Sequence, residues 1–175
     1  MAQITTQTGG FYYAKYQFKR SILENALLSQ YSTEDHAAAL EYFGGCAFCG
    51  KKPASRKDHL VAVVECGDFV RQNVVPACQE CDDSKGRKPY RDWMLHSKSK
   101  KSLRRRLGMS TNEIDARIKK IEEWQNGYVC GDEEALFGSD YPKYRDILKK
   151  MEALCQEAEG LASKAKLRRT EERGG

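Results

Sequence analysis

Two pairs of cysteines bracket the middle of this 175-residue chain. Cys46 and Cys49 form one C-x-x-C pair, Cys78 and Cys81 form a second, and 28 residues separate the pairs. Two such pairs supply four thiolates, which complete the tetrahedral coordination of zinc. A closed four-cysteine site has no open position for water or substrate. We therefore expect a structural zinc ion that ties the first pair to the start of a following helix.

The rest of the composition is that of a globular protein without a membrane segment. Hydrophobic residues make up 40% and charged residues 31% of the chain, and no apolar run approaches the about 18 residues of a membrane span. The first residues lack the pattern of a secretory signal. We expect an intracellular, cytoplasmic protein, in which the other cysteines (Cys66, Cys130 and Cys155) are packing thiols.

Capping patterns predict two helices before the first cysteine pair. Ser21 precedes Glu24 by three residues, and Ser32 precedes Asp35 by three, as in a capping box. A glycine pair ends the second helix. These two helices make a predicted N-terminal helical segment, residues 1–44, that covers the core.

Residues 45–95 change to a strand-like and then a helical pattern. "HLVAVV" and "NVVPA" predict two short strands with the loop "ECGDFVRQ" between them. "CQECDDSKGRKPYRDWML" then predicts a helix. The chain is therefore expected to be α+β and mostly helical, with a small ββα core flanked by N-terminal and C-terminal helices.

Two more segments follow. Residues 96–140 predict a basic helical hairpin, in which Ser110 and Glu113 form a capping box and isoleucines line one face of the second helix. "LGMSTNEIDARI" also resembles the start of a helix-turn-helix recognition helix, although plain packing is favoured. Residues 141–175 predict a C-terminal helix, frayed from about Thr170. Its apolar residues form a short seam that suits either packing on the core or a homodimer: Ile147, Met151, Leu154, Ala158, Leu161 and Ala165.

Positive charge is concentrated after the second cysteine pair. The net charge is only +5, but residues 85–106 contain ten Lys or Arg against the single acid Asp92. Such a local surplus favours a polyanionic partner over a solvated helix face. The expected phosphate-contacting residues are Lys85, Arg87, Lys88, Arg104, Arg105 and Arg106.

Polar residues within and just after the cysteine bracket have the types needed for phosphodiester hydrolysis. Asp58 and His59 are adjacent, Asn73 follows His59 by 14 positions, and Asp82 comes directly after Cys81, the last cysteine of the second pair. A neutral imidazole suits a general base, and carboxylates suit a hard divalent cation.

The arrangement "DH…N…VVPACQECDDSKG" resembles the HNH, or ββα-metal, endonuclease family in its zinc-stapled form. The resemblance covers roughly residues 43–93. It implies that His59 is the general base and that Asp58 and Asp82 bind one Mg²⁺ or Mn²⁺ ion. It also implies that Asn73 braces the hairpin and orients the base. Two features depart from the family: "HLVA" lacks the usual proline, and Asp82 stands where His or Asn is common.

Structural roles remain as alternatives for these residues. Asp58 could cap a turn, Asp82 could cap a helix with Asp83 as a rival ligand, and Asn73 and His59 could be purely structural. The sequence therefore predicts a metal-dependent endonuclease acting on DNA, favoured as duplex, of a restriction, homing or phage-related kind. The alternatives are a non-catalytic zinc-stapled nucleic-acid-binding module and an RNA-directed nuclease or toxin with an inhibitory partner.

Overall fold

The computed structural model describes residues 9–95 and 107–174. The chain divides into two compact units, of which one spans residues 26–133. The other combines the N-terminal stretch up to residue 25 with residues 134–175. The protein is mostly helical with one small antiparallel sheet, as the α+β prediction requires.

A two-stranded sheet lies at the centre of the first unit. Strand β1 (Arg56–His59) pairs antiparallel with β2 (Val74–Ala77), and His59 lies opposite Val74. All four residues of β2 are buried, which fits a run of apolar residues with a proline. Helix α3 (Gln79–Lys85) follows β2 after a single residue, Cys78. The order strand, strand, helix therefore matches the sequence prediction.

The first strand ends earlier than predicted. Of "HLVAVV", only His59 belongs to a strand, and the chain continues into two short 3₁₀ helices, η1 (Val63–Glu65) and η2 (Arg71–Asn73). The Asn73 side chain accepts a hydrogen bond from the backbone N–H of Val61 and donates one to its carbonyl oxygen. Because both backbone groups of Val61 are thereby satisfied outside the ladder, the strand cannot continue through this position.

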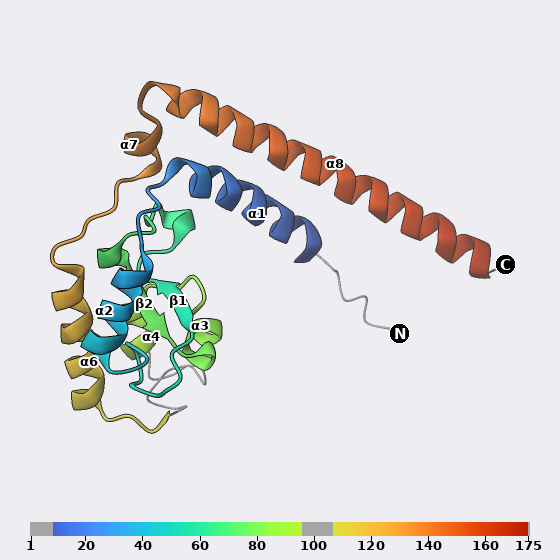
Figure 1. Cartoon of the computed structure of the whole chain (residues 1–175). Helices are drawn as coiled ribbons and strands as arrows, with labels where there is room; N and C mark the ends of the chain where they lie inside the picture. The colour runs from blue at the N-terminus through green and yellow to red at the C-terminus, as the bar shows by residue number, and fades with distance from the viewer. Residues whose placement is uncertain (1–8, 96–106, 175) are drawn as a thin grey trace. The chain divides into compact units, whose positions relative to one another are not determined.

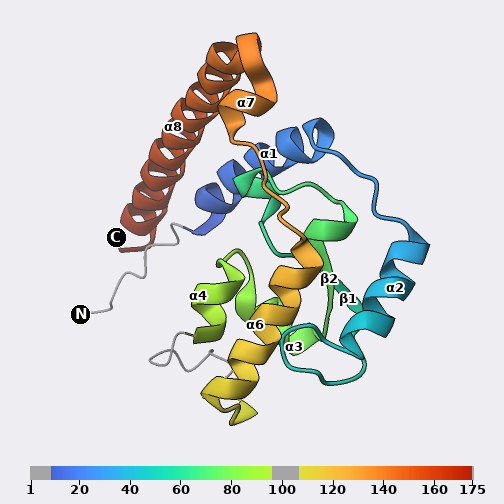
Figure 2. The same ribbon diagram turned by 90° about the vertical axis from the view of Figure 1, so that its left-hand side faces the viewer.

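Three helices complete the core of this unit around the sheet (Figures 1 and 2). They are α2 (Thr33–Phe43), α4 (Tyr90–Leu95) and α6 (Thr111–Gln125). The capping boxes predicted before α2 and α6 are both present, and they place the two helix starts where the sequence indicated. The isoleucine face of α6 is buried together with side chains from every neighbouring element: Ala39, Phe43, Phe48, Leu60, Val75, Trp93, Met94, Ile114, Ile118 and Ile121.

The single helix predicted after the second cysteine pair is two short helices. Gly86 ends α3 with a positive φ of 53°, a conformation that favours glycine. Pro89 stands immediately before α4, where its missing N–H is not needed. The basic helix predicted after α4, with Arg104, Arg105 and Arg106, lies outside the described residues.

The second unit is a helical arm. Helix α1 (Gly9–Ala26) and the long helix α8 (Tyr141–Gly174) run antiparallel, preceded by α7 (Glu133–Phe137) and η3 (Gly138–Asp140). Lys15 contacts Glu152 at 3.0 Å between the two long helices. The prediction that a helix starts at Ser21 is wrong, because α1 begins twelve residues earlier. Helix α8 also continues past Thr170, so the predicted fraying is not observed.

None of the described helices is both long and apolar enough to cross a bilayer.

We predict that Gly67→Ala strongly destabilises the central unit. A Cβ at this position would collide with the carbonyl oxygen of Val61 and would lie 2.8 Å from Nδ2 of Asn73. Overpacking of this kind costs about 1–3 kcal/mol, which a urea titration measures directly. Gly160→Ala in α8 is the control: nothing lies within 4 Å of its Cβ, so higher helix propensity should leave stability unchanged or raised. Equal effects of the two substitutions would contradict the prediction.

Candidate functional site

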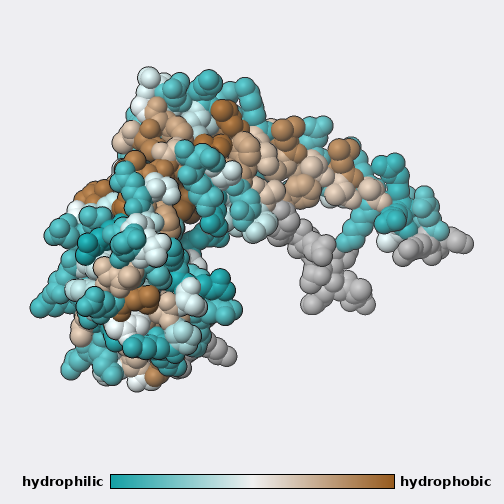
Figure 3. Space-filling view, in the orientation of Figure 1, coloured by the Kyte–Doolittle hydropathy of each residue, from teal (hydrophilic) through white to brown (hydrophobic). Residues whose placement is uncertain are grey.

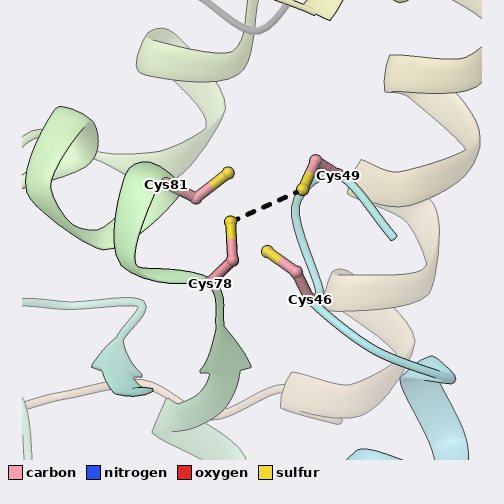
Figure 4. A group of neighbouring side chains, drawn as sticks. All are labelled: Cys46, Cys49, Cys78 and Cys81. Atoms are coloured by element: carbon pink, nitrogen blue, oxygen red, sulfur yellow. Dashed lines mark hydrogen bonds between the residues drawn. The ribbon is translucent and has the colours of Figure 1, made fainter. Parts of the chain in front are cut away.

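The four bracket cysteines converge on one point (Figure 4). Cys46 and Cys49 come from the loop after α2, Cys78 precedes α3, and Cys81 lies within α3. Their Sγ atoms all lie within 4.8 Å of one another, and those of Cys49 and Cys78 are 3.7 Å apart. None of the seven cysteines, all of which are in the described residues, forms a disulfide. The cluster could therefore hold a metal ion.

Backbone hydrogen bonds shape the loop that carries the first cysteine pair. The N–H of Cys46 donates to the carbonyl of Lys51 at 3.0 Å, and the N–H of Gly50 donates to the carbonyl of Cys46 at 2.8 Å. The N–H of Ala47 donates to the carbonyl of Pro76 in β2 at 2.8 Å. The loop is thus closed on itself and joined to the strand that leads into the second pair.

The crowded thiols strongly perturb one another. Hydrogen bonding with Cys49 lowers the pKa of the Cys46 thiol, whereas hydrogen bonding with Cys46 raises the pKa values of Cys49 and Cys81. One thiolate is favoured, and further negative charge at the same point is opposed. A cation at the centre would remove that opposition, because it stabilises all four thiolates together.

Asp58 lies on β1 and is buried against α3. The ammonium of Lys85, which is 1% exposed, donates to Asp58 Oδ1 at 3.2 Å, to the carbonyl of His59 at 2.8 Å and to that of Gly86 at 3.3 Å. Asp58 Oδ2 is 3.1 Å from the same ammonium, yet it receives no hydrogen bond from any described residue. Burial raises the pKa of Asp58 to about 6, although Lys85 acts in the opposite direction.

Asp82 is half-buried on α3, and its negative charge reaches Asp58. The pKa of Asp82 is raised, first by burial and then by the neighbouring charge of Asp83. The charge of Asp82 in turn contributes to the raised pKa of Asp58. The structure therefore places both predicted metal-binding carboxylates on facing elements, β1 and α3. Among the described residues, however, only the cysteine cluster brings three or more candidate ligand atoms within 4.8 Å.

His59 ends β1, and its ring is half-buried against an aromatic neighbour. Its ring centroid lies 5.3 Å from that of Phe69, and its Nε2 atom is buried. Adjacent strand residues point to opposite faces, so the His59 ring leaves β1 away from the side on which Asp58 meets Lys85. Phe69 is itself fixed, because its carbonyl accepts hydrogen bonds from the N–H groups of Gln30 and Tyr31.

Asn73 is fully buried at the end of η2 and holds the loop that follows His59. Besides its two bonds to Val61, its Nδ2 donates to the carbonyl of Asp68 at 2.9 Å. Its own carbonyl accepts from the N–H of Leu60 at 2.8 Å. The backbone carbonyl of Asn73 therefore holds Leu60, the residue after His59, and the side chain of Asn73 holds Val61.

The predicted phosphate-contacting residues have different environments. Lys85 is buried, and its ammonium donates to Asp58 and to two carbonyls, so its partners in this structure are protein groups. Arg87 and Lys88 are exposed and line an open groove of about 480 Å³ together with Val64, Glu65, Lys85 and Gly86. The positive charge of this groove comes from the segment directly after α3.

Comparisons with known proteins found no relative. No family model matches the chain, and no curated protein or solved structure matches it either.

Two neighbours of the predicted residues were not anticipated. Lys85 was expected on the surface, but "DSKG" places it one helical turn after Asp82, on the face that meets β1. Phe69 carries no local signal, because its contact with His59 depends on the fold of the loop. The first could have been found from helix spacing, and the second could not.

We predict that Cys81→Ser removes the bound metal and destabilises the central unit. The substitution takes away one of four thiolate ligands, and the remaining three form an incomplete site. Metal content by mass spectrometry should fall from one ion per chain toward zero, with a lower melting temperature. Cys130→Ser is the control, since this thiol lies outside the cluster and donates to the carbonyl of Glu65. Full metal content in the Cys81 variant would contradict the assignment.

We predict that Lys85→Met destabilises the protein by about 3 kcal/mol or more at pH 7.5, because it leaves a buried carboxylate without a counter-charge. Without Lys85, the folded-state pKa of Asp58 should rise further above its ordinary value of 3.8. A raised carboxyl pKa adds stability below the unfolded pKa, and that stability is lost as the pH rises through the folded pKa. The deficit should therefore shrink between pH 7.5 and pH 4.5.

Urea titrations at the two pH values, each compared with the exposed variant Lys88→Met, test this prediction. The control should remain within about 0.5 kcal/mol of the wild type at both pH values. A deficit for Lys85→Met that is independent of pH would show that the ion pair with Asp58 is not its cause.

Proposed function

We propose that residues 45–95 form a zinc-stapled HNH core and that the protein is a metal-dependent DNA endonuclease. The observation that carries the proposal is the pairing of β1 with β2 directly before α3, with Asp58 and His59 ending β1 and Asp82 on α3. The residues that resemble the HNH family therefore lie on two strands and a helix in the order that the resemblance implies. Asn73 lies between the strands and ties the loop after His59.

Zinc is the metal proposed for the cysteine cluster. Four thiolates in a closed cluster are the donor set of a structural zinc site. A saturated ion cannot take substrate, so its role is to join the loop after α2 to the start of α3. A ββα unit with two four-residue strands has few stabilising contacts of its own, and such a tie contributes directly to its folding.

A second divalent cation, Mg²⁺ or Mn²⁺, is proposed at the carboxylates. Asp58 Oδ2 is a buried acceptor that receives no hydrogen bond from a described residue, although the Lys85 ammonium lies 3.1 Å away. Asp82 is on α3, which contacts β1, and its charge acts on Asp58. When bound, the cation supplies positive charge for the phosphate oxygens and the leaving oxygen. Lys85 would keep the buried region near neutral through its hydrogen bonds to Asp58 and two carbonyls.

His59 is the proposed general base. Its imidazole can take a proton from water near physiological pH, which lets the water attack the phosphorus atom. Phe69 and Asn73 hold the ring and the following backbone, so the proton acceptor keeps a defined position. The expected products carry 5′-phosphate and 3′-hydroxyl ends. Arg87 and Lys88, which are exposed and directly follow α3, are the proposed phosphate contacts.

A non-catalytic nucleic-acid-binding module is the second candidate. The observation that favours it is the Lys85–Asp58 ion pair, which already gives Asp58 a structural role without any cation. The exposed Arg87 and Lys88 would then serve binding alone. Under this alternative, His59 would only pack against Phe69.

A nicking assay on supercoiled plasmid separates the two candidates. We expect cleavage that requires Mg²⁺ or Mn²⁺ and that falls at least about 100-fold in His59→Ala, because a general base contributes on that scale. Each variant is first shown to be folded and metal-loaded by circular dichroism and mass spectrometry. His36→Ala is the matched histidine control: its ring contacts Tyr31, it has no part in the proposed site, and the activity of this variant should equal that of the wild type.

Two outcomes would overturn the nuclease proposal. The first is a folded, metal-loaded wild type that binds DNA without cutting it in either cation. The second is cutting that persists unchanged in His59→Ala. The first outcome would establish the binding module instead.

A further inference from the structure

An apolar stripe runs along the outer side of α8 in the helical arm. Ile147, Leu154 and Leu161 recur every seven residues, and they are 38%, 62% and 59% exposed. Since seven residues make nearly two full turns, the three side chains lie on one line along the helix. Figure 3 shows apolar atoms recurring along this arm between hydrophilic ones.

The stripe is distinct from the side of α8 that packs within its own chain. The buried residues of α8 are Tyr144 and Cys155, and Glu152 contacts Lys15 of α1. Each lies about 80–160° around the helix from Leu154 at 100° per residue. Helix α8 has 34 residues against 18 in α1, so about half its length extends beyond what α1 can reach. Every described side chain from Gly160 onward is exposed.

Alternating charges flank the stripe on one side. Lys150, Glu157, Lys164 and Glu171 recur every seven residues, all of them exposed. These four residues share one position of the seven-residue repeat, and on the helix surface that position lies beside the one shared by Leu154 and Leu161. Lys150 contacts Asp146 of its own helix at 2.7 Å, on the surface, where such pairs contribute little.

This charge order is complementary to itself only when one copy is reversed. Read backward, the order lysine, glutamate, lysine, glutamate becomes glutamate, lysine, glutamate, lysine. In an antiparallel pair the same flanking positions meet, so Glu157 would face Lys164 of the second copy, and Lys150 would face Glu171. A shift by one heptad in either direction brings like charges together. In a parallel pair, Lys150 and Glu157 would face the uncharged Cys155 and Ala162 instead.

We propose that α8 is a homodimerisation helix that pairs antiparallel with α8 of a second copy, centred near Gly160. In this register the leucines of the stripe meet alanines: Leu161 packs on Ala158 of the second copy, and Leu154 packs on Ala165. The large and small side chains interlock, and the two helices can approach closely. Four charge pairs border the seam, because the pair of Glu157 with Lys164 and the pair of Lys150 with Glu171 each form twice in a two-fold symmetric dimer. This proposal does not depend on the nuclease proposal, since it rests on the helical arm alone.

The mass of the whole chain in solution, measured by light scattering and sedimentation, tests the proposal. At about 50 µM we expect twice the 19.9 kDa of one chain. Glu157→Lys should weaken the dimer at least about tenfold, because two attractive pairs become repulsive. Lys164→Glu should do the same. The double variant Glu157→Lys with Lys164→Glu restores opposite charges and should return the dissociation constant to near that of the wild type.

Lys166→Glu is the matched control, because it makes the same charge change roughly 200° around the helix from Lys164 and should leave the dimer intact. Rescue by the double variant is an outcome that loss of helix stability alone cannot produce. A monomeric wild type would overturn the proposal. So would a dimer that ignores the single reversals, which would indicate a parallel pair or another surface. Weakening that the double variant does not rescue would also overturn the proposed register.

Discussion

The convergence of four thiols is the constraint on which the central unit depends. Each strand of the sheet has only four residues, and α3 has seven, so none of these elements would be stable alone. The cysteine cluster joins the loop after α2 to the start of α3, and Ala47 joins the same loop to β2. Because the thiols oppose one another's ionisation, the cluster is also the place where a bound cation would contribute most to folding.

A second constraint acts on the opposite end of α3. Lys85 reaches back to β1 and contacts Asp58 and the carbonyl of His59, while the cysteines hold the start of the same helix. Helix α3 is therefore held at both ends: the cysteine cluster joins its start to the loop after α2, and the Lys85–Asp58 ion pair joins its end to β1. The buried ion pair does not by itself add much stability, but losing one partner would be costly. It thus restricts where Asp58 and the backbone of His59 can lie.

The sequence predicted the elements whose signals are local. The capping boxes at Ser32 and Ser110, the buried strand "NVVPA" and the cysteine cluster all depend on residues close in sequence or on ligand chemistry. The end of β1 was predicted wrongly. The strand stops because the side chain of Asn73 takes the backbone hydrogen bonds of Val61, and these two residues are 12 positions apart in the sequence. The pairing of α1 with α8 joins the two ends of the chain, and no local pattern at Ser21 could indicate it.

The arrangement of the candidate site explains why a binding module and a nuclease are hard to separate by residue type alone. Asp58 and Asp82 lie on facing elements, whereas His59 leaves β1 toward Phe69. Metal binding would act on the first two residues, and proton transfer would act on the third. A protein that only binds nucleic acid needs Asp58 as the partner of Lys85, but it has no need for a second carboxylate whose pKa is raised. Asp82 is therefore the residue on which the two candidates differ most, because the nuclease proposal gives its carboxylate a cation to bind, whereas a binding module leaves it only its place in the first turn of α3.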